Sequence, residues 1–387
     1  VDGMTTTTSA EAATAPTPAA SSGPAPYRAA DHTRDYFELS ERVKAAGLMG
    51  RNVRSYMVRT AVLAVAFAGA FALLLTLGST WWQLAVAALF GILFTQAAFL
   101  GHDAAHQQVF ANGRRNEWFS RVVGNLVVGL SIAWWNRKHN KHHAHPNTIG
   151  RDGDIAPGWL VFVPGDAQER TGFMGWLLRR QGYAFVPLLS LFAFVLHYEA
   201  IASLLRQKKV KHRAFELTLV LIRIIGFPVI VLVVLGPVLG AAFLAVQLAV
   251  FGITMGGSFA PNHKGMALIP QGMEVDFLRR QVLTSRNITG GRLMNIAMGG
   301  LDLQIEHHLF PRMPSANLRK VRPIVREFCA ERGIIYTETN LISSYRVIIS
   351  YLNKVGLGYA DPFDCPLASQ LRGAPLPSSQ LQGTPAS

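Results

Sequence analysis

Four long apolar segments, arranged as two closely joined pairs, limit what this chain can fold into more than any other feature. They cover about residues 57–78, 81–101, 215–235 and 238–260. Each is long enough to cross roughly 30 Å of hydrocarbon as an α-helix. The members of each pair are separated only by Ser79-Thr80 or by Gly236-Pro237. The pattern predicts an all-α integral membrane protein with four transmembrane helices in two hairpins.

Composition and charge support a membrane protein with one basic side. Half of the residues are hydrophobic and 16% are charged, which is too apolar for an ordinary soluble domain. The formal net charge is +14, and the two short turns carry no Lys or Arg. By the positive-inside rule, we expect a multi-pass protein with both termini in the cytoplasm. We expect the membrane to be a bacterial plasma membrane. No basic face on a soluble domain is visible, so we expect no nucleic-acid partner.

The remaining segments divide into a cap and two tails. We expect a membrane domain over residues 28–360, with a cytosolic helical cap formed by residues 102–182 and 261–360. Residues 183–205 are apolar but contain Pro187, His197 and Glu199, which favours a re-entrant or interfacial helix over a full span. Residues 1–27 lack the basic-then-apolar order of a signal peptide, and residues 361–387 are rich in Pro, Ser and Gln. We expect a disordered leader and a disordered tail there.

Eight histidines cluster at the cytosolic ends of the apolar segments. Spacings of three or four residues place imidazoles on one edge of a helix, where they can bind the same metal ion. A single pair of this kind is usually solvated or satisfied in a core, but eight buried imidazoles would be costly to leave without partners. The set predicts two metal ions with four or five nitrogen ligands each, and it consists of His102, His106, His139, His142, His143, His263, His307 and His308.

The donor set favours iron over zinc. Zinc usually takes four ligands and often uses cysteine, whereas Cys329 and Cys365 both lie in the polar C-terminal part of the chain. An all-nitrogen pair of sites fits non-haem iron better, although composition alone leaves the metal open.

The histidine motifs resemble the three histidine boxes of membrane-bound fatty acid desaturases. The boxes are His102-x-x-x-His106, His139-x-x-His142-His143 and Gln304-x-x-His307-His308. The flanking residues resemble the front-end branch of that family, whose third box begins with Gln. They are Trp134-Trp135, Pro146-Asn147, Asp152-Gly153-Asp154, Phe310-Pro311 and Met313-Pro314. The resemblance covers about residues 30–355.

This resemblance implies a di-iron enzyme that uses O2 and two electrons to insert a cis double bond into a long acyl chain. The iron ligands would be the seven histidines of the boxes, with His263 as an additional ligand. Gln304 stands where many relatives have a ninth histidine, and it would bind weakly, bind through water or only shape the pocket. Asp103, Asp154 and Glu306 are candidates to orient imidazole N–H groups, with surface-charge roles open for each. We leave out His32, His145, His197 and His212, which fall outside the boxes.

The resemblance also implies a substrate and a redox partner. The substrate would be a long-chain acyl-CoA or an acyl lipid. Membrane lipid would surround the protein. The sequence contains no His-Pro-Gly-Gly haem motif, so we expect an external electron donor: a ferredoxin, a rubredoxin or a cytochrome b5-like protein, with its reductase. Two other functions stay open. One is an acyl hydroxylase on the same scaffold, and the other is a non-enzymatic membrane protein that binds metal or haem.

Overall fold

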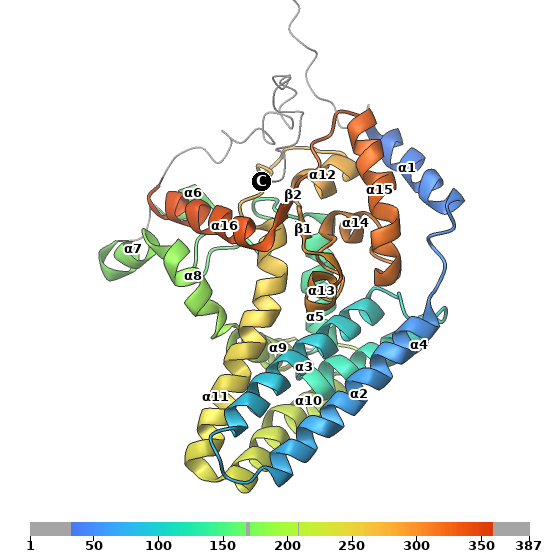
Figure 1. The fold of residues 1–387 in the computed structure, drawn as a ribbon. Coiled ribbons are helices and arrows are strands. Elements are labelled where there is room, and N and C mark those ends of the chain that lie inside the picture. The colour runs from blue at the N-terminus through green and yellow to red at the C-terminus, as the bar shows by residue number, and fades with distance from the viewer. Residues whose placement is uncertain (1–31, 168–170, 208, 359–387) are drawn as a thin grey trace, which may run out of the picture.

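The fold is a bundle of long helices that carries a cap of shorter ones (Figure 1). The computed structural model describes residues 32–167, 171–207 and 209–358. The expected leader at 1–27 and tail at 361–387 lie outside the described residues.

The long helices pack around α3 (Gln83–Ala105), which contacts α2 (Val53–Thr76) and α11 (Phe227–His263). Their core is rich in phenylalanine, and the rings of Phe90 and Phe227 lie 5.1 Å apart in an edge-to-face contact. Before α11 the chain forms α10 (Arg213–Leu221) and the π-helical turn η3 (Ile222–Gly226). At Gly236 the helix breaks, with a φ of 74° that favours glycine, and the second part of α11 folds back so that the ring of Phe243 lies 6.4 Å from that of Phe227.

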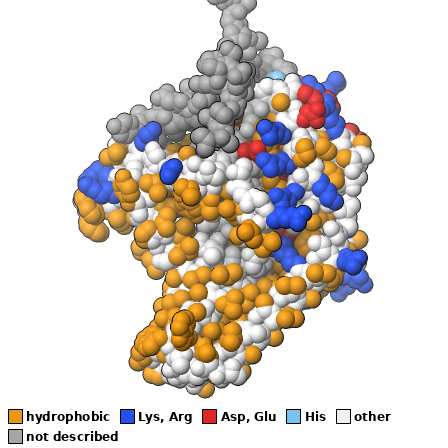
Figure 2. Space-filling view, in the orientation of Figure 1, with side chains coloured by type: hydrophobic (Ala, Val, Ile, Leu, Met, Phe, Trp, Pro, Cys, Tyr) orange, Lys and Arg blue, Asp and Glu red, His pale blue; other side chains and the backbone are white. Residues whose placement is uncertain are grey.

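Within the described residues, three helical stretches are long and apolar enough to cross a membrane, namely Val53–Thr76, Gln83–Ala105 and Arg213–His263. The last is 51 residues long and contains the break at Gly236, which separates the segments expected at 215–235 and 238–260. In Figure 2 the lower part of the molecule, where these helices lie, presents hydrophobic side chains and no Lys or Arg on the visible face. Its exposed residues include Val65 and Val233, at 72% and 79% exposure. Such a surface suits lipid rather than water.

The segment expected to be re-entrant or interfacial forms two helices bent by 71°, α8 (Gln181–Leu189) and α9 (Phe192–Arg206). Together they are apolar enough for a span, so they form either a broken span or a re-entrant loop. Pro187 lies in the last turn of α8, next to the bend.

The cap has its own core, in which Leu39, Leu278, Val321 and Phe328 are fully buried. Helices α1 (Thr33–Ala45), α12 (Phe277–Leu283), α14 (Gln304–Leu309) and α15 (Ser315–Glu331) contribute to this core. Two shorter helices, α4 (Gly113–Arg121) and η2 (Val122–Val128), pack against α3 of the bundle. The remaining shorter helices are α5 (Ile132–Ala144), α6 (Pro164–Ala167), α7 (Gly172–Leu178), α13 (Gly291–Ala297) and α16 (Leu341–Gly356). The all-α prediction is wrong in one detail. Strands β1 (Asn287–Thr289) and β2 (Glu338–Asn340) pair in parallel, because the chain between them crosses the cap and returns.

Candidate metal centre

Four helices bring the eight expected histidines together at the junction of bundle and cap. His102 lies in the last turn of α3, with His106 directly after the helix. His263 ends α11, three histidines lie on α5, and His307 and His308 lie on the short α14. The Oγ of Ser131 caps α5 by accepting from the backbone N of Trp134, and it donates to the buried Glu216 on α10. The start of α5 is therefore fixed to the bundle.

Five imidazoles form the first cluster, which contains His102, His106, His139, His143 and His307, with ligand nitrogens all within 4.8 Å of one another. The Nε2 of His139 lies 3.0 Å from that of His102, 2.8 Å from that of His106 and 3.0 Å from that of His143. A ring nitrogen has one proton or one lone pair, so it makes one good hydrogen bond in the ring plane. Three such contacts at one nitrogen indicate lone pairs that converge on a common point.

Three imidazoles form the second cluster, which contains His142, His263 and His308. Each Nδ1 contacts an oxygen of the protein: Asp152 Oδ2 at 2.9 Å, the Thr284 carbonyl at 3.0 Å and Gln281 Oε1 at 2.8 Å, respectively. These contacts require a proton on each Nδ1 and leave each Nε2 with a free lone pair.

The two clusters fit metal ions. The Nε2 of His308 is buried and has no hydrogen-bond partner among the described residues, which is costly unless it binds something else. Burial also lowers the pKa of five imidazoles well below the usual range, those of His106, His139, His143, His307 and His308. A neutral imidazole is the form that binds a metal.

Three aspartates of the site contact imidazoles, whereas Glu306 contacts other side chains. Asp103 Oδ1 lies 3.2 Å from the Nδ1 of His102, and Asp154 Oδ2 lies 3.5 Å from the Nδ1 of His142. Asp152 is closer to His142, at 2.9 Å, and the sequence-based set omitted it. Burial would lower the pKa of His142, but the hydrogen bond and charge of Asp152 raise it. Glu306 instead accepts hydrogen bonds from Tyr336 and Asn287, and burial raises its pKa to about 7.

Gln304 lies against the second cluster. Its Nε2 is 2.9 Å from the Nε2 of His263, and its Oε1 accepts from Asn262. The side chain therefore lies beside the three imidazoles, with its amide nitrogen toward His263 and its oxygen held by Asn262.

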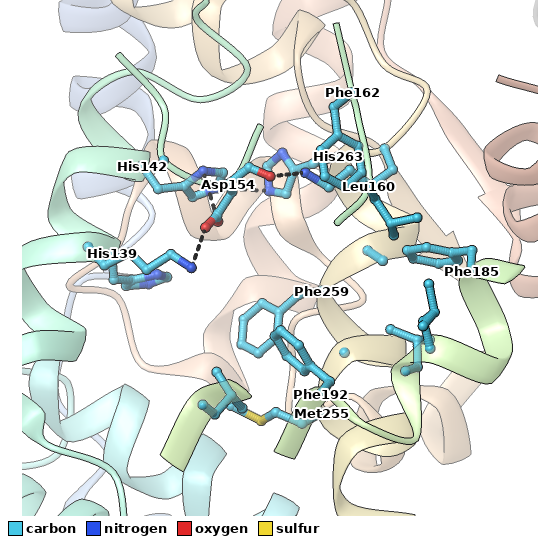
Figure 3. A pocket seen from close by; sticks show the side chains of 18 of the residues that line it. His139, His142, Asp154, Leu160, Phe162, Phe185, Phe192, Met255, Phe259 and His263 are labelled. Carbon is cyan, nitrogen blue, oxygen red and sulfur yellow. Dashed lines mark hydrogen bonds and ion pairs between the residues drawn. The ribbon is translucent and has the colours of Figure 1, made fainter. Parts of the chain in front are cut away.

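An apolar pocket of about 280 Å³ opens onto the imidazoles (Figure 3). One wall carries His139, His142, His263 and Gln304. The ring of Trp135, which also lines the pocket, stacks on His139 at 4.9 Å. The other walls come from the 153–162 segment, α8, α9 and α11, and they include Leu160, Phe162, Phe185, Leu189, Phe192, Leu196, Met255 and Phe259. Such a space accepts a flexible apolar chain close to the metal ligands.

Sequence reasoning missed two side chains that hold the second cluster. Asp152 could have been found from the sequence, because it lies two residues before Asp154 and after the second histidine box. Gln281 could not have been found in this way, since it lies 27 residues before its partner His308. Among the histidines left out, His145 lies by Arg280 and His197 contacts the Gly129 carbonyl, so neither joins a cluster.

The known proteins to which this chain is similar are fatty acid desaturases. The fatty acid desaturase family model matches residues 79–340. A Delta(8)-fatty-acid desaturase of Helianthus annuus is 26% identical over 87% of this chain and 76% of its own length. An acyl-lipid (9-3)-desaturase of Physcomitrium patens is 31% identical over 72% of this chain and 54% of its own length. A Delta(6)-fatty-acid desaturase of Caenorhabditis elegans is 28% identical over 82% of this chain and 74% of its own length.

The family match spans most of the chain and includes all three histidine boxes. The chain therefore belongs to the fatty acid desaturase family.

Proposed function

We propose that this chain is a membrane-bound acyl desaturase with two non-haem iron ions. The reaction removes one hydrogen from each of two adjacent methylenes. Together with O2, two electrons and two protons, it yields a cis double bond and two water molecules. The observation that carries the proposal is the arrangement of the eight imidazoles, whose Nε2 atoms converge in two adjacent groups beside an apolar pocket.

The eight histidines hold the two ions, five in the first cluster and three in the second. Asp103, Asp152 and Asp154 orient His102 and His142, and Gln304 completes the second cluster directly or through water. Glu306 supports α14 through Asn287 rather than acting on an imidazole. When bound, the iron ions supply the reaction with O2 that breaks two unactivated C–H bonds.

The protein contributes alignment. A saturated chain has no polar group at the reacting carbons, so only the shape of the pocket can bring one pair of methylenes to the histidine wall. Phe192, Met255 and Phe259 line the pocket beside that wall (Figure 3). Their rings and thioether exclude water from the reacting carbons.

We place the metal centre and both termini on the cytoplasmic side, with α2, α3 and the two parts of the 213–263 helix as four spans in two hairpins. The turns at 77–82 and 236–237 contain no Lys or Arg, which supports this orientation. The named relatives come from a flowering plant, a moss and a nematode. They lend no support to the bacterial plasma membrane expected from the sequence.

The substrate is a long-chain acyl-CoA or acyl lipid, desaturated at the carboxyl side in the front-end manner. The electrons come from a separate ferredoxin, rubredoxin or cytochrome b5-like donor with its reductase. Exposed basic residues on the cap, such as Arg312, Arg319 and Lys320, suit an acidic donor.

Product analysis tests the proposal. Wild type, His142→Ala and the control His145→Ala are expressed in the same host, and double bonds in the total fatty acids are located by derivatisation and mass spectrometry. We expect a new unsaturated acid with wild type and His145→Ala, and none with His142→Ala. New hydroxy acids would instead indicate an acyl hydroxylase. Unchanged lipids despite two bound irons and a supplied donor would contradict desaturation.

A further inference from the structure

One half-buried lysine in the substrate pocket has no assigned role in the metal centre. Lys264 follows the ligand His263 directly, and its side chain lines the apolar pocket. Its Nζ donates to the backbone carbonyl of Asp154 at 2.6 Å and lies 4.0 Å from the centroid of the Phe162 ring. It makes no ion pair with a carboxylate among the described residues.

The carboxylate nearest to this pocket is already engaged elsewhere. Asp154 Oδ1 pairs with Lys138 Nζ at 3.1 Å, and Asp154 Oδ2 faces His142. Figure 3 shows Asp154 between His142 and His263, at the polar end of the pocket. An ammonium has three N–H donors, so Lys264 retains donors for a further partner. A cation at one end of an apolar pocket is costly without such a partner.

The pocket therefore has a polar end, where Asp154 lies beside His142 and His263, and an apolar end, where Phe192 and Met255 lie (Figure 3). Lys138 and Lys264 both contact Asp154 and so belong to the polar end. An acyl chain has the same polarity, because its carbonyl oxygen is its one acceptor next to a long run of methylenes. Placing a double bond at a fixed number of carbons from the carbonyl requires a donor that holds this oxygen.

We propose that the Lys264 ammonium donates a hydrogen bond to the carbonyl oxygen of the acyl substrate and so sets the position of the double bond. The inference rests on the proposed desaturase function. Ester lipid, CoA thioester and free carboxylate share this acceptor, so Lys264 recognises the carbonyl rather than a particular headgroup. Lys264 is a specificity-determining residue in this scheme, and it takes no part in breaking the C–H bonds.

The first measurement is the distribution of double-bond positions in cells expressing wild type, Lys264→Met, Lys264→Arg and Lys141→Met. Lys141 is an exposed lysine on α5 and serves as the matched control. We expect about tenfold less product with Lys264→Met, spread over more than one position, because a hydrogen bond from a charged donor is lost. Lys264→Arg and Lys141→Met should keep the wild-type position. A single wild-type position in Lys264→Met at the wild-type amount would overturn the proposal.

The second measurement needs no turnover, so it separates this inference from the proposed function. The purified full chain is offered equal amounts of a phosphatidylcholine with ester-linked chains and its ether-linked analogue, which lacks the carbonyls. Native mass spectrometry then gives the ratio bound. We expect an ester preference of about tenfold in wild type that disappears in Lys264→Met. A role limited to holding the 153–162 segment would weaken both lipids alike and leave the ratio unchanged, which would overturn the proposal.

A third arm identifies the carrier. Oleoyl-CoA and oleic acid are added separately as competitors of the ether-linked lipid, which lacks the carbonyls, for wild type and Lys264→Met. If Lys264 binds the carbonyl oxygen, the stronger competitor with wild type loses its advantage over the ether lipid in Lys264→Met. If both competitors displace the ether lipid equally well from the two proteins, recognition lies elsewhere and the proposal is contradicted.

Discussion

The Nδ1 of His142 lies 2.9 Å from Oδ2 of Asp152, a buried carboxylate ten residues further along the chain. Asp152 also accepts hydrogen bonds from the backbone N of Asn147 and of Asp154, so the carboxylate is itself fixed. This contact sets the tautomer of His142 and aims its Nε2 at the second cluster.

We predict that Asp152→Asn weakens the second metal site. The amide is neutral and can present an N–H where His142 needs an acceptor, so metal affinity should fall by about 10- to 100-fold. Iron retained during titration with a chelator measures the effect. Glu274→Gln, which changes an exposed carboxylate, is the control. Equal iron retention in both variants would show that Asp152 does not orient a ligand.

We predict that Glu216→Ala destabilises the whole site from a distance. The Glu216 carboxylate accepts from Arg121 Nε at 3.2 Å, Ser131 Oγ at 2.7 Å and the backbone N of Ala133 at 3.2 Å. Its loss leaves these donors buried and loosens the start of α5, so we expect a free energy of unfolding lower by about 3 kcal/mol. Thermal unfolding in detergent tests this against Glu117→Ala, the other partner of Arg121, which is more exposed. A smaller shift for Glu216→Ala than for Glu117→Ala would contradict the account.

We predict that Met255→Trp shortens the acyl chains that are accepted. Met255 is buried and lines the apolar part of the pocket, whereas Ile253 on the same helix is exposed. A larger side chain there overfills the space, and turnover of the longest substrates should fall by about tenfold or more. Iron content should stay unchanged. Chain lengths of the products give the readout, and Ile253→Trp is the control. An unaltered distribution of product chain lengths in Met255→Trp would mean that the acyl chain does not pass Met255.

We predict that Gln304→His strengthens metal binding at the second cluster. The Gln304 side chain is 2.9 Å from His263 Nε2, and an imidazole there would add a fourth nitrogen donor. Loss of iron to a chelator should be roughly tenfold slower than in wild type. Gln304→Leu, which keeps the apolar volume but has no donor, should lose iron at least as fast as wild type. If all three proteins lose iron at one rate, Gln304 lies outside the coordination sphere.

The helical character and the grouping of the histidines could be predicted from the sequence, because both depend on local spacing. Apolar runs of about 20 residues and imidazoles three or four positions apart are visible without tertiary structure. The division into five and three could not be predicted. His142 and His143 are neighbours in sequence but face different clusters, and only the packing of α5 against α3, α11 and α14 decides which joins which.

The contacts that support the metal site could not be predicted from the sequence either. The Gln281 contact to His308 and the Thr284 carbonyl at His263 join residues more than 20 positions apart. Glu306 shows the opposite case. Its position between Gln304 and His307 suggested a role at the imidazoles, but on the short α14 its carboxylate faces Asn287 and Tyr336. The strands β1 and β2 were missed because three residues each leave no detectable alternation.

The most direct test of the central claim is to count iron in the purified protein and in single-cluster variants. Elemental analysis with Mössbauer spectroscopy should find two non-haem irons per chain in wild type. It should find about one in His307→Ala, which alters the first cluster, and about one in His308→Ala, which alters the second. Wild-type protein with a single iron, or with zinc at full activity, would contradict a di-iron centre built from these two clusters.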